Sequence, residues 1–426
     1  MTTLLWGFIF VLLALFGAPL FAIMGSIAML AFTAAEIDRS AVIVELYRIA
    51  LNPSFVAIPL FTFAGYVLAE SNSPRRLVDL ARAVFGSIPG GLAVVALLTC
   101  ALFTAFTGAS GVTIVALGGL LYPILIQERY PERFSLGLVT TSGSLGLLFP
   151  PSLPLILYAV VAQLNIDRLF AGALLPGILL VVMLSVYGIW IGKKTRVPTT
   201  PFQWKIVASS LRAAIWEVPL PVVIIGGIYS GLFTATEAAA ITAFYAVVVE
   251  VFVYRDLHLF RDIPRVMRDS MLLVGAIFMI IGVAMGLTNY LIDEEVPTAL
   301  FEFTKTFISS PVMFLVVLNI FLLIVGMMMD IFSAIIVVVP LIIPIARQYG
   351  IDDIHLGVIF LANLEIGYLT PPVGLNLFIS SLRFKKPVLD VVRATLVFIG
   401  ILLIALMVIT YVPGLTLLLV HAAGVH

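Results

Sequence analysis

The stretches GSLGLLFPPS at residues 143–152 and EIGYLTPPVG at residues 365–374 decide the fold of this chain. Each contains two glycines and a proline pair, and each lies inside an apolar segment long enough to cross a bilayer. Proline removes a backbone donor and glycine weakens a helix, so each segment is predicted to be a transmembrane helix that is interrupted at membrane depth. Lipid cannot satisfy the freed backbone groups, so protein, water or an ion must do so.

The two stretches belong to halves that repeat each other at a constant offset of 221 residues, the separation of Pro371 from Pro150. The residues that match at this offset are those that break or weaken helices. Paired, interrupted spans at matching places in two halves indicate a secondary-transport site. The matching pairs are Gly65 with Gly286, Pro123 with Pro344, Gly146 with Gly367, and Pro150-Pro151 with Pro371-Pro372.

The composition is that of a polytopic membrane protein. Of 426 residues, 62% are hydrophobic and only 11% are charged, against about 25% charged in soluble domains. The net charge is zero, which gives no reason to expect a nucleic-acid partner. The single cysteine, Cys100, lies in an apolar run and is interpreted as a packing residue. The first apolar run follows an uncharged Met-Thr-Thr, without the basic start of a signal peptide, and is expected to be a retained span.

We therefore predict an all-α membrane protein built from two repeats. The first repeat covers residues 1–192, a cytoplasmic interfacial linker covers 193–217, and the second repeat covers 218–426. Most of the predicted segments fit the roughly 20 residues that cross a hydrocarbon core. The segments are 3–17, 18–34, 55–71, 91–127, 134–162 and 168–192 in the first half, and 218–233, 236–254, 269–292, 311–346, 354–382 and 390–416 in the second.

Segments 91–127 and 311–346 are each about two helices long and have a polar or glycine-rich middle. Each is either two complete spans or a re-entrant hairpin that turns back inside the protein. Both alternatives give every half an odd number of crossings, so the second half must lie upside down relative to the first. Segments 134–162 and 354–382 are the two broken helices that accompany these hairpins.

Basic residues orient the chain through the positive-inside rule. With the N-terminus outside and two re-entrant hairpins, 18 of the 23 basic residues fall in inner loops. Both termini are then predicted to be periplasmic, with the first hairpin opening from the cytoplasm and the second from the outer face. The basic residues left outside are Arg39, Arg48, Arg168, Lys305 and Arg347.

Two amphipathic pieces and one capping motif lie between the spans. Residues 74–88 and 202–216 place apolar and basic side chains on opposite helical faces, which is typical of helices in the membrane interface. They are interpreted as braces of a scaffold, with a gating role as the alternative. The run from Thr234 to Glu237 fits a helix capping box.

The first candidate ion site lies at the first hairpin tip and the facing break. Hydroxyls and freed carbonyls are hard oxygen donors, and carbonyls at helix ends carry partial negative charge, which suits a sodium ion without a buried carboxylate. Close helix packing through small residues is the alternative explanation. The candidate sodium ligands here are Gly108, Ser110, Ser142, Gly143, Gly146 and Pro150, with Thr107, Ser144 and Ser152 assigned to substrate.

The second candidate site contains two carboxylates within apolar spans, Asp330 and Glu365, and such residues are rare and usually functional. They could ligate a cation, hold a proton, or tie down an unwound backbone. Asn363 and Asn376 flank the break and could contact substrate or cap helix ends. The candidate sodium ligands here are Gly326, Asp330, Gly367, Thr370 and Pro371, with Glu365 and Asn376 assigned to substrate.

Enzymatic alternatives find little support in the sequence. Residues 108–111 fit the G-x-S-G pattern of an intramembrane serine protease, which needs a nearby base such as histidine. The four histidines lie in predicted loops or at the C-terminus. No phosphate-binding loop or dinucleotide fingerprint is present, so direct use of ATP is not expected. A membrane-embedded enzyme and a purely structural scaffold stay as remote alternatives.

At this point the chain resembles a known family. GAPLFAIMG (17–25), IPLFTFAGYVLAES (58–71), TGASGVTIVALGGLLYPIL (107–125), GLFTATEAAAI (231–241) and NLEIGYLTPPVGLNLF (363–378) are similar to the large membrane subunit of tripartite ATP-independent periplasmic (TRAP) transporters. The resemblance runs over essentially the whole chain. It implies a sodium-coupled importer of organic acids in the bacterial inner membrane, not an enzyme. It also implies an elevator mechanism, a separate small four-helix membrane subunit and a periplasmic substrate-binding protein.

Carried over by position, the resemblance puts one sodium ion near Ser110 and the 143–151 break. It puts another near Gly326, Asp330 and the 367–372 break, with substrate between the two hairpin tips. Two or more sodium ions and no organic cofactor are expected. No arginine or lysine falls in the predicted core to hold a substrate carboxylate, so helix N-termini and polar side chains are expected to serve. A stand-alone carrier of the related ion-coupled superfamily is the alternative.

Overall fold

The computed structural model describes residues 6, 9–10, 12–13, 16, 18–38, 40, 42–44, 47, 54–199 and 201–422. Every regular element in these ranges is helical, which confirms the predicted all-α fold. Seven of the helices found there are long and apolar enough to cross a membrane, or up to nine if each bent pair is one span. The predicted first span at 3–17 lies mostly outside the described residues, as do Arg39 and Arg48.

The elements of the first half follow the predicted segments closely. They are α2 (Leu20–Ala34), α4 (Ser54–Glu70), α5 (Ser73–Phe85), α6 (Gly91–Thr107), α7 (Ser110–Thr113), the π-helix η1 (Ile114–Gly118), α8 (Gly119–Gln127), α9 (Glu132–Ser142), the 3-10 helix η2 (Leu145–Leu148), α10 (Leu153–Val161) and α11 (Ile166–Lys194).

The linker and the second half give a corresponding series. It consists of α12 (Trp204–Ala213), α13 (Pro219–Tyr229), α14 (Ala235–Val248), the π-helix η3 (Val249–Val253), α15 (Asp262–Asp293), α16 (Val296–Lys305), α17 (Pro311–Met328), α18 (Ile331–Gln348), α19 (Asp353–Gly367), α20 (Leu375–Phe384), α21 (Val388–Tyr411) and α22 (Pro413–Ala422).

Each long segment folds as a helical hairpin. In the first, α6 ends at Gly108, whose φ of 64° is a left-handed conformation that glycine adopts without strain. The chain then returns through α7, η1 and α8. Gly90, Tyr130 and Glu128 line one small cavity, so the two arms begin and end at the same end of the molecule. In the second hairpin, Met329 and Asp330 separate α17 from α18.

Both broken helices are interrupted where the sequence predicts. Between α9 and α10 the chain passes through η2 and Pro150-Pro151, and the two helices bend by 43°. Between α19 and α20 it passes through Pro371-Pro372 to Gly374, which has a φ of 45°. The α-helix ends before each proline pair, at Ser142 and at Gly367, and the prolines cannot extend it because proline supplies no N–H.

The broken helices run in opposite directions. We call residues 128–133 the Arg133 end and residues 346–353 the Arg347 end. The first broken helix starts at the Arg133 end, and its last turn reaches the Arg347 end, where Gln163 and Arg347 line one cavity. The second starts at the Arg347 end and finishes at the Arg133 end, where Lys386 forms an ion pair with Glu132. The two halves therefore have the inverted arrangement that their odd crossing numbers predict.

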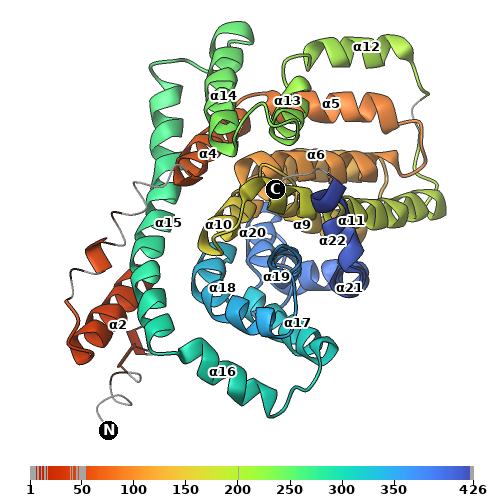
Figure 1. Ribbon diagram of the computed structural model, residues 1–426. Coiled ribbons are helices and arrows are strands. Elements are labelled where there is room, and N and C mark those ends of the chain that lie inside the picture. Colours follow the sequence, from red (N-terminus) through yellow and green to blue (C-terminus); the bar gives the residue numbers. More distant parts are fainter. Residues whose placement is uncertain are drawn as a thin grey trace.

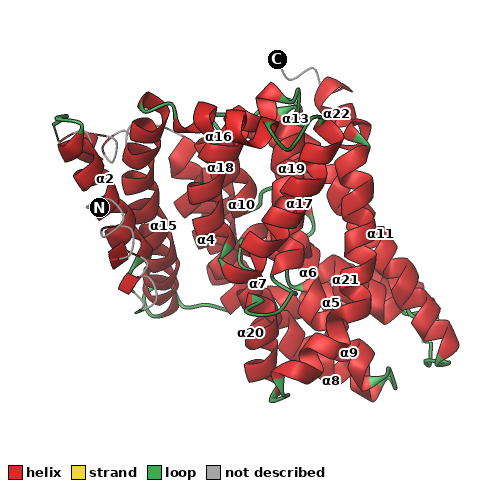
Figure 2. Cartoon of the chain, turned by 90° about the horizontal axis from the view of Figure 1, so that it is seen from below, coloured by secondary structure: helices red, strands yellow, loops and turns green. Residues whose placement is uncertain are grey.

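The remaining helices surround the hairpins on one side. Helix α4 packs on α14 and α15, and α15 packs on α2. In Figure 1, α15 runs as a long helix along one side of the molecule, and α16 leads from its end to the second hairpin. Figure 2 shows α2 and α15 at one edge and α11 and α21 toward the other. We refer to α2, α4, α14 and α15 as the scaffold.

The two predicted amphipathic pieces are helical. They form α5 and α12, which pack together and lie side by side in Figure 1. Arg82 of α5 pairs with Glu128, so α5 lies at the Arg133 end. The capping box is confirmed, since the Thr234 hydroxyl accepts a bond from the backbone N–H of Glu237 and the Glu237 carboxylate accepts one from the backbone N–H of Thr234.

Two predicted spans differ from the structure. Helix α13 has only 11 residues, short of the roughly 20 that cross a hydrocarbon core, because the chain turns at Gly231 with a φ of 71° before α14 begins. The predicted span 390–416 is also two helices, because Pro413 starts α22 after α21 has ended at Tyr411. Proline is favoured in a first helical turn and disfavoured within a helix, which explains the second boundary.

Candidate functional site

The first hairpin tip lies against the first helix break. The Thr104 hydroxyl donates to the carbonyl of Gly143 over 2.9 Å and lies 2.6 Å from the hydroxyl of Thr113. A Cβ built on Gly143 would lie 3.2 Å from the carbonyl oxygen of Ser110. The tip therefore turns back at the middle of the broken helix. Of the two arrangements predicted for residues 91–127, the structure has the re-entrant hairpin.

Three hydroxyl groups at this junction have no hydrogen-bond partner in the described part of the chain. They belong to Thr107, Thr141 and Ser152, and all three side chains are fully buried. Leaving a buried hydroxyl without a partner costs about 1–3 kcal/mol of folding free energy. A cation that binds the hydroxyl oxygens would therefore stabilise this junction. Neutral oxygens are ligands that hard cations accept. The residues present thus fit a sodium ion.

The other residues predicted for the first site have different surroundings. Ser142 and Ser144 donate to backbone carbonyls of their own helix, at Val139 and Thr141. Gly146 packs against the α6 backbone, where a Cβ would come within 2.5 Å of the nitrogen of Ala105. Pro150 is buried within the break. Close packing therefore accounts for Gly146, while Gly143 and Ser110 lie at the tip junction.

The second hairpin tip meets the second break in a similar way. Gly326 and Gly367 are in backbone contact, since a Cβ on Gly367 would lie 2.5 Å from the Cα of Gly326. The N–H of Gly374 donates to the carbonyl of Met327 over 3.2 Å. The Tyr368 hydroxyl accepts a 2.7 Å bond from the N–H of Ile331. Residues 311–346 therefore also form a re-entrant hairpin.

Asp330 ties down an unwound backbone, which is one of the three roles that the sequence left open. It is the N-cap of α18, and its Oδ1 accepts bonds from the N–H groups of Phe332 and Ser333, each 3.0 Å long. The Ser333 hydroxyl donates to the other carboxylate oxygen over 2.5 Å. The side chain therefore holds the unwound backbone at the tip, and it also faces the cavity described below.

Glu365 differs from Asp330 in its surroundings. It is fully buried in α19, and neither carboxylate oxygen has a hydrogen-bond partner in the ranges that the structure describes. Thr370 is half-buried and donates to the carbonyl of Ile366 over 2.9 Å, and Pro371 is exposed. Of the five predicted ligands at this break, Gly326 and Gly367 are brought into direct contact.

Asn376 joins the two halves. Its Oδ1 accepts a 2.8 Å bond from the hydroxyl of Ser110 at the first hairpin tip. Its amide nitrogen donates to the carbonyl of Thr140 over 3.4 Å. The side chain is fully buried, so α20 of the second half is fixed to the tip and the broken helix of the first.

A cavity of about 540 Å³ lies between the two hairpin tips, within the size range of small-molecule sites. Its walls come from both tips, from α20 and from two scaffold helices, α4 and α15. Of the residues predicted to bind ions, Gly108, Ser110 and Asp330 line it. Those predicted to bind substrate, Thr107, Ser144, Ser152, Glu365 and Asn376, are buried and do not line it.

The sequence did not indicate several residues of this region. Thr104 and Thr141 lie within helices, which gives no sign of a site, although the Thr104 hydroxyl bonds to Gly143 and Thr113 at the tip and the Thr141 hydroxyl is buried without a partner in the described part of the chain. Tyr66 and Glu70, which line the cavity, belong to a scaffold helix far away in sequence. A run of threonines close to a helix break is the signal that could have found the first group.

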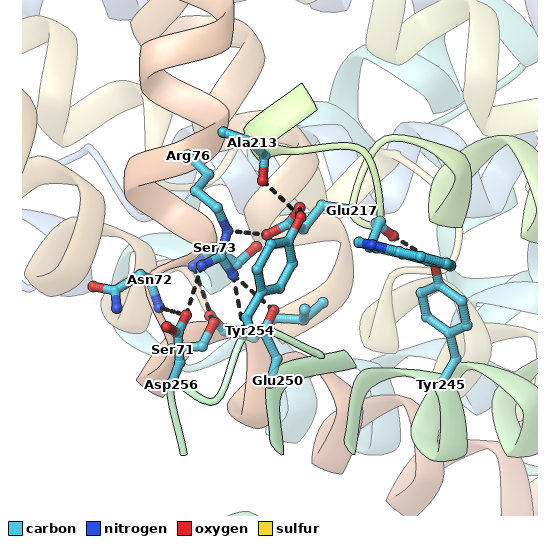
Figure 3. A network of polar contacts seen from close by, with 12 residues as sticks. Ser71, Asn72, Ser73, Arg76, Ala213, Glu217, Tyr245, Glu250, Tyr254 and Asp256 are labelled. Atoms are coloured by element: carbon cyan, nitrogen blue, oxygen red, sulfur yellow. Dashed lines mark hydrogen bonds and ion pairs between the residues drawn. The ribbon is translucent and has the colours of Figure 1, made fainter. Parts of the chain in front are cut away.

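A buried charge cluster outside the cavity was also not predicted (Figure 3). Arg76, at the start of α5, forms ion pairs with Glu217, with Glu250 at 2.9 Å and with Asp256 at 2.6 Å. Its guanidinium group lies 3.7 Å from the ring centre of Tyr254. We call these five residues the Arg76 cluster. It joins α5 to η3 and to the segment between α12 and α13.

Hydrogen bonds favour the ionised form of Asp256 in the Arg76 cluster. Burial opposes ionisation of Asp256, but bonds from Asn72 and Arg76 outweigh it and hold the pKa of Asp256 below its ordinary value. The Tyr254 hydroxyl donates to Glu217 over 2.8 Å. The cluster therefore fixes the bend of 72° between α4 and α5, next to the scaffold wall of the cavity.

Comparison with solved structures supports the architecture. The YdaH transporter of Alcanivorax borkumensis superposes with a TM-score of 0.64 at 11% sequence identity, covering 87% of this chain and 86% of that one. At this identity the likeness shows the fold alone. It confirms the predicted polytopic, all-helical fold.

Comparison of sequences shows the family. A family model described as tripartite ATP-independent periplasmic transporter, DctM component, matches residues 4–415. The C4-dicarboxylate TRAP transporter large permease protein DctM of Pseudomonas aeruginosa is 38% identical over 94% of this chain and 93% of that protein. The isethionate TRAP transporter permease protein DctMQ of Oleidesulfovibrio alaskensis is 34% identical over 84% of this chain and 57% of that protein.

The family match covers both hairpins, both breaks and the cavity between them. A component of a tripartite system also implies further components. With a family model matched over most of its length, the chain belongs to the DctM component family of tripartite ATP-independent periplasmic transporters, as a multi-pass membrane permease and not an enzyme.

Proposed function

We propose that the protein is the transporting subunit of a sodium-coupled importer of an organic acid. The observation that carries this proposal is the meeting of two re-entrant tips with two helix breaks around one cavity of about 540 Å³. Three buried hydroxyls at the first junction have no hydrogen-bond partner among the described residues, and the backbone at the second junction is unwound. Such sites supply oxygen ligands for a sodium ion at the depth where substrate binds.

The proposed substrate class follows from the names of two relatives. The names of the two relatives specify C4-dicarboxylates and isethionate, which are small organic anions. Each sodium ion that moves inward contributes about 2.3 kcal/mol per 100 mV of membrane potential. More sodium ions than the anion has negative charges, two with isethionate or three with a C4-dicarboxylate dianion, would bring net positive charge inward, so uptake would use both the sodium gradient and the potential.

The proposed mechanism is an elevator in which the hairpins and broken helices move as one body against the scaffold. Asn376 supports this, because it fastens the second broken helix to the first hairpin tip. We place the Arg133 end in the cytoplasm, following the basic residues in inner loops. The cavity includes Glu70, at the end of α4 next to α5, so this conformation is then inward-facing.

The proposed boundaries follow the inverted arrangement. Residues 1–192 form the first repeat, 193–217 the cytoplasmic linker and 218–426 the second repeat, with both termini periplasmic. The proposed location is the bacterial inner membrane. The proposed partners are a small four-helix membrane subunit and a periplasmic substrate-binding protein. The longer DctMQ relative supports the first partner, because this chain covers only 57% of it.

Two hydroxyl substitutions test the ion sites. We expect Ser110→Ala and Thr370→Ala each to raise the sodium concentration for half-maximal uptake about tenfold, which corresponds to about 1.4 kcal/mol. Uptake is measured in cells that express the assembled transporter, and expression should stay near the wild-type level. Thr99→Ala is the matched control, because its buried hydroxyl donates to carbonyls of α6 more than two helical turns before the first tip and lies in neither predicted ion site. Unchanged sodium dependence in both variants would show that the site assignment is wrong.

Reconstitution separates this function from its alternatives. We expect the purified chain in proteoliposomes to take up no organic acid until the small subunit and a loaded binding protein are added. Sodium-dependent uptake by the chain alone would support a stand-alone carrier. A melting temperature that does not respond to sodium would favour a structural scaffold.

A further inference from the structure

One guanidinium group, on the exposed side chain of Arg383, lies just beyond the predicted broken helix 354–382 and at the rim of the cavity. Arg383 belongs to the last turn of α20. Leu375 and Ile379 line the cavity, and Arg383 follows Ile379 by four residues, so all three share one helical face. One turn of four residues advances about 6 Å along a helix, which places Arg383 just beyond the lining residues.

The first hairpin, which forms the opposite wall of the cavity, also contacts the guanidinium group of Arg383. The Nε of Arg383 donates to the carbonyl of Val115 over 3.0 Å, and Val115 lines the cavity from the first hairpin. The neighbouring Gly119 leaves space for the guanidinium group, since a Cβ there would lie 2.8 Å from Cζ of Arg383. Arg383 is thus held between two segments that both form the cavity wall.

The charge of Arg383 is not neutralised within the described residues. It has no carboxylate within ion-pair distance there, and its single hydrogen bond uses Nε, which leaves both terminal nitrogens without an acceptor. The other arginine near the cavity differs, because Arg265 pairs with Glu70 at 2.9 Å. A planar guanidinium group with two free nitrogens has the geometry to bind a carboxylate or a sulfonate.

We propose that Arg383 binds the anionic group of the substrate at the rim of the cavity and sets the preference for organic anions. The inference rests on the function proposed above, in which the cavity carries an organic acid. Both Val115 and Arg383 belong to the hairpin and broken-helix body, so the guanidinium group would travel with the substrate. The remainder of the substrate would then extend toward the hairpin tips.

The test separates charge from the hydrogen bond to Val115. The purified chain is titrated with succinate at saturating sodium, and binding is followed as a rise in melting temperature. Arg383→Lys keeps the charge and should weaken succinate binding less than fivefold. Arg383→Gln keeps a donor for the Val115 carbonyl but not the charge, and should weaken binding at least tenfold. Equal binding by wild type and Arg383→Gln would overturn the proposal, as would a wild-type protein that does not respond to succinate.

Two further variants complete the design. Gly119→Ala displaces the guanidinium group without removing it, and should also weaken succinate binding at least tenfold. Lys385→Ala removes a second exposed charge two residues away and should leave binding unchanged; an equal loss there would mean that general surface charge is responsible. Stabilisation by sodium alone should be the same in every variant. Its absence from the wild type would contradict the proposed function, whereas its retention with unaltered succinate binding in Arg383→Gln contradicts only the role of Arg383.

Discussion

Glycine at positions 326 and 367 allows two backbones to touch where the second hairpin meets the second break. Lipid offers no hydrophobic driving force for association between spans, so close approach through small residues and interhelical hydrogen bonds supplies the stabilisation. Gly65 of the scaffold works in the same way, since its Cβ would meet the backbone of Phe106 and Thr107 at the first tip. At the scale of single residues, the site depends on absent side chains as well as on oxygen ligands.

Substitution of Gly367 by alanine tests this packing. The added Cβ would lie 2.5 Å from the Cα of Gly326, and overpacking of this kind costs about 1–3 kcal/mol. We expect a lower melting temperature in detergent and loss of sodium-dependent uptake. Gly400→Ala is the control, because no atom of the described residues lies within 4 Å of its Cβ position and the change should be neutral or slightly stabilising. Wild-type melting and uptake in Gly367→Ala would contradict the packing argument.

At the scale of elements, the Arg76 cluster fixes the amphipathic arms to the scaffold (Figure 3). Arg76 and Glu250 are 13% and 0% exposed, so the pair is shielded from solvent. One guanidinium group balances several carboxylates that come from α12–α13, η3 and the loop after it. Removing the cation would leave those carboxylates buried without a counter-charge, whereas the intact cluster adds little net stability beyond correct placement.

Arg76→Ala should therefore destabilise the protein by about 3–5 kcal/mol, the cost of breaking a buried pair. The neighbouring Arg75→Ala changes an exposed side chain and should stay within about 0.5 kcal/mol of wild type. Thermal unfolding of both variants in the same detergent gives the comparison. If the two melted alike, the cluster would be of no structural importance.

At the scale of the whole molecule, inversion lets one half reproduce the position of the other across the membrane. The first broken helix runs from the Arg133 end to the Arg347 end, and the second runs back. The hairpin tips reach the breaks from opposite ends and leave the cavity between them. Movement of the hairpin and broken-helix body against the scaffold would then expose that cavity to each side in turn.

Cysteine labelling tests the inverted arrangement directly. The only cysteine, Cys100, is 1% exposed, so Cys100→Ser provides a suitable background. Gln348→Cys and Lys385→Cys lie at the Arg347 end and the Arg133 end. We expect a membrane-impermeant maleimide added to intact spheroplasts to label the first and not the second, and both after lysis. Labelling of both from one side would exclude inverted halves.

The sequence by itself determined the membrane class, the two halves and the places where helices break. These features are local: proline and glycine act within a turn of their own position, and apolar length sets the number of spans. The predicted breaks, the amphipathic helices α5 and α12 and the Thr234 cap follow from such signals. The short α13 and the division between α21 and α22 did not, because glycine and proline near the ends of an apolar run leave the boundary open.

Only the tertiary structure decided which groups meet. Ser110 and Asn376 are 266 residues apart, and Arg76 lies between 141 and 180 residues from its three acidic partners. No periodicity in the chain encodes such pairs, because they depend on the packing of whole helices against one another. The residues of the hairpin tips and breaks could be found from the sequence, because glycine and proline mark them locally. The cavity wall on α4 and α15, and Arg383 at its rim, emerged only when two inverted halves were folded together.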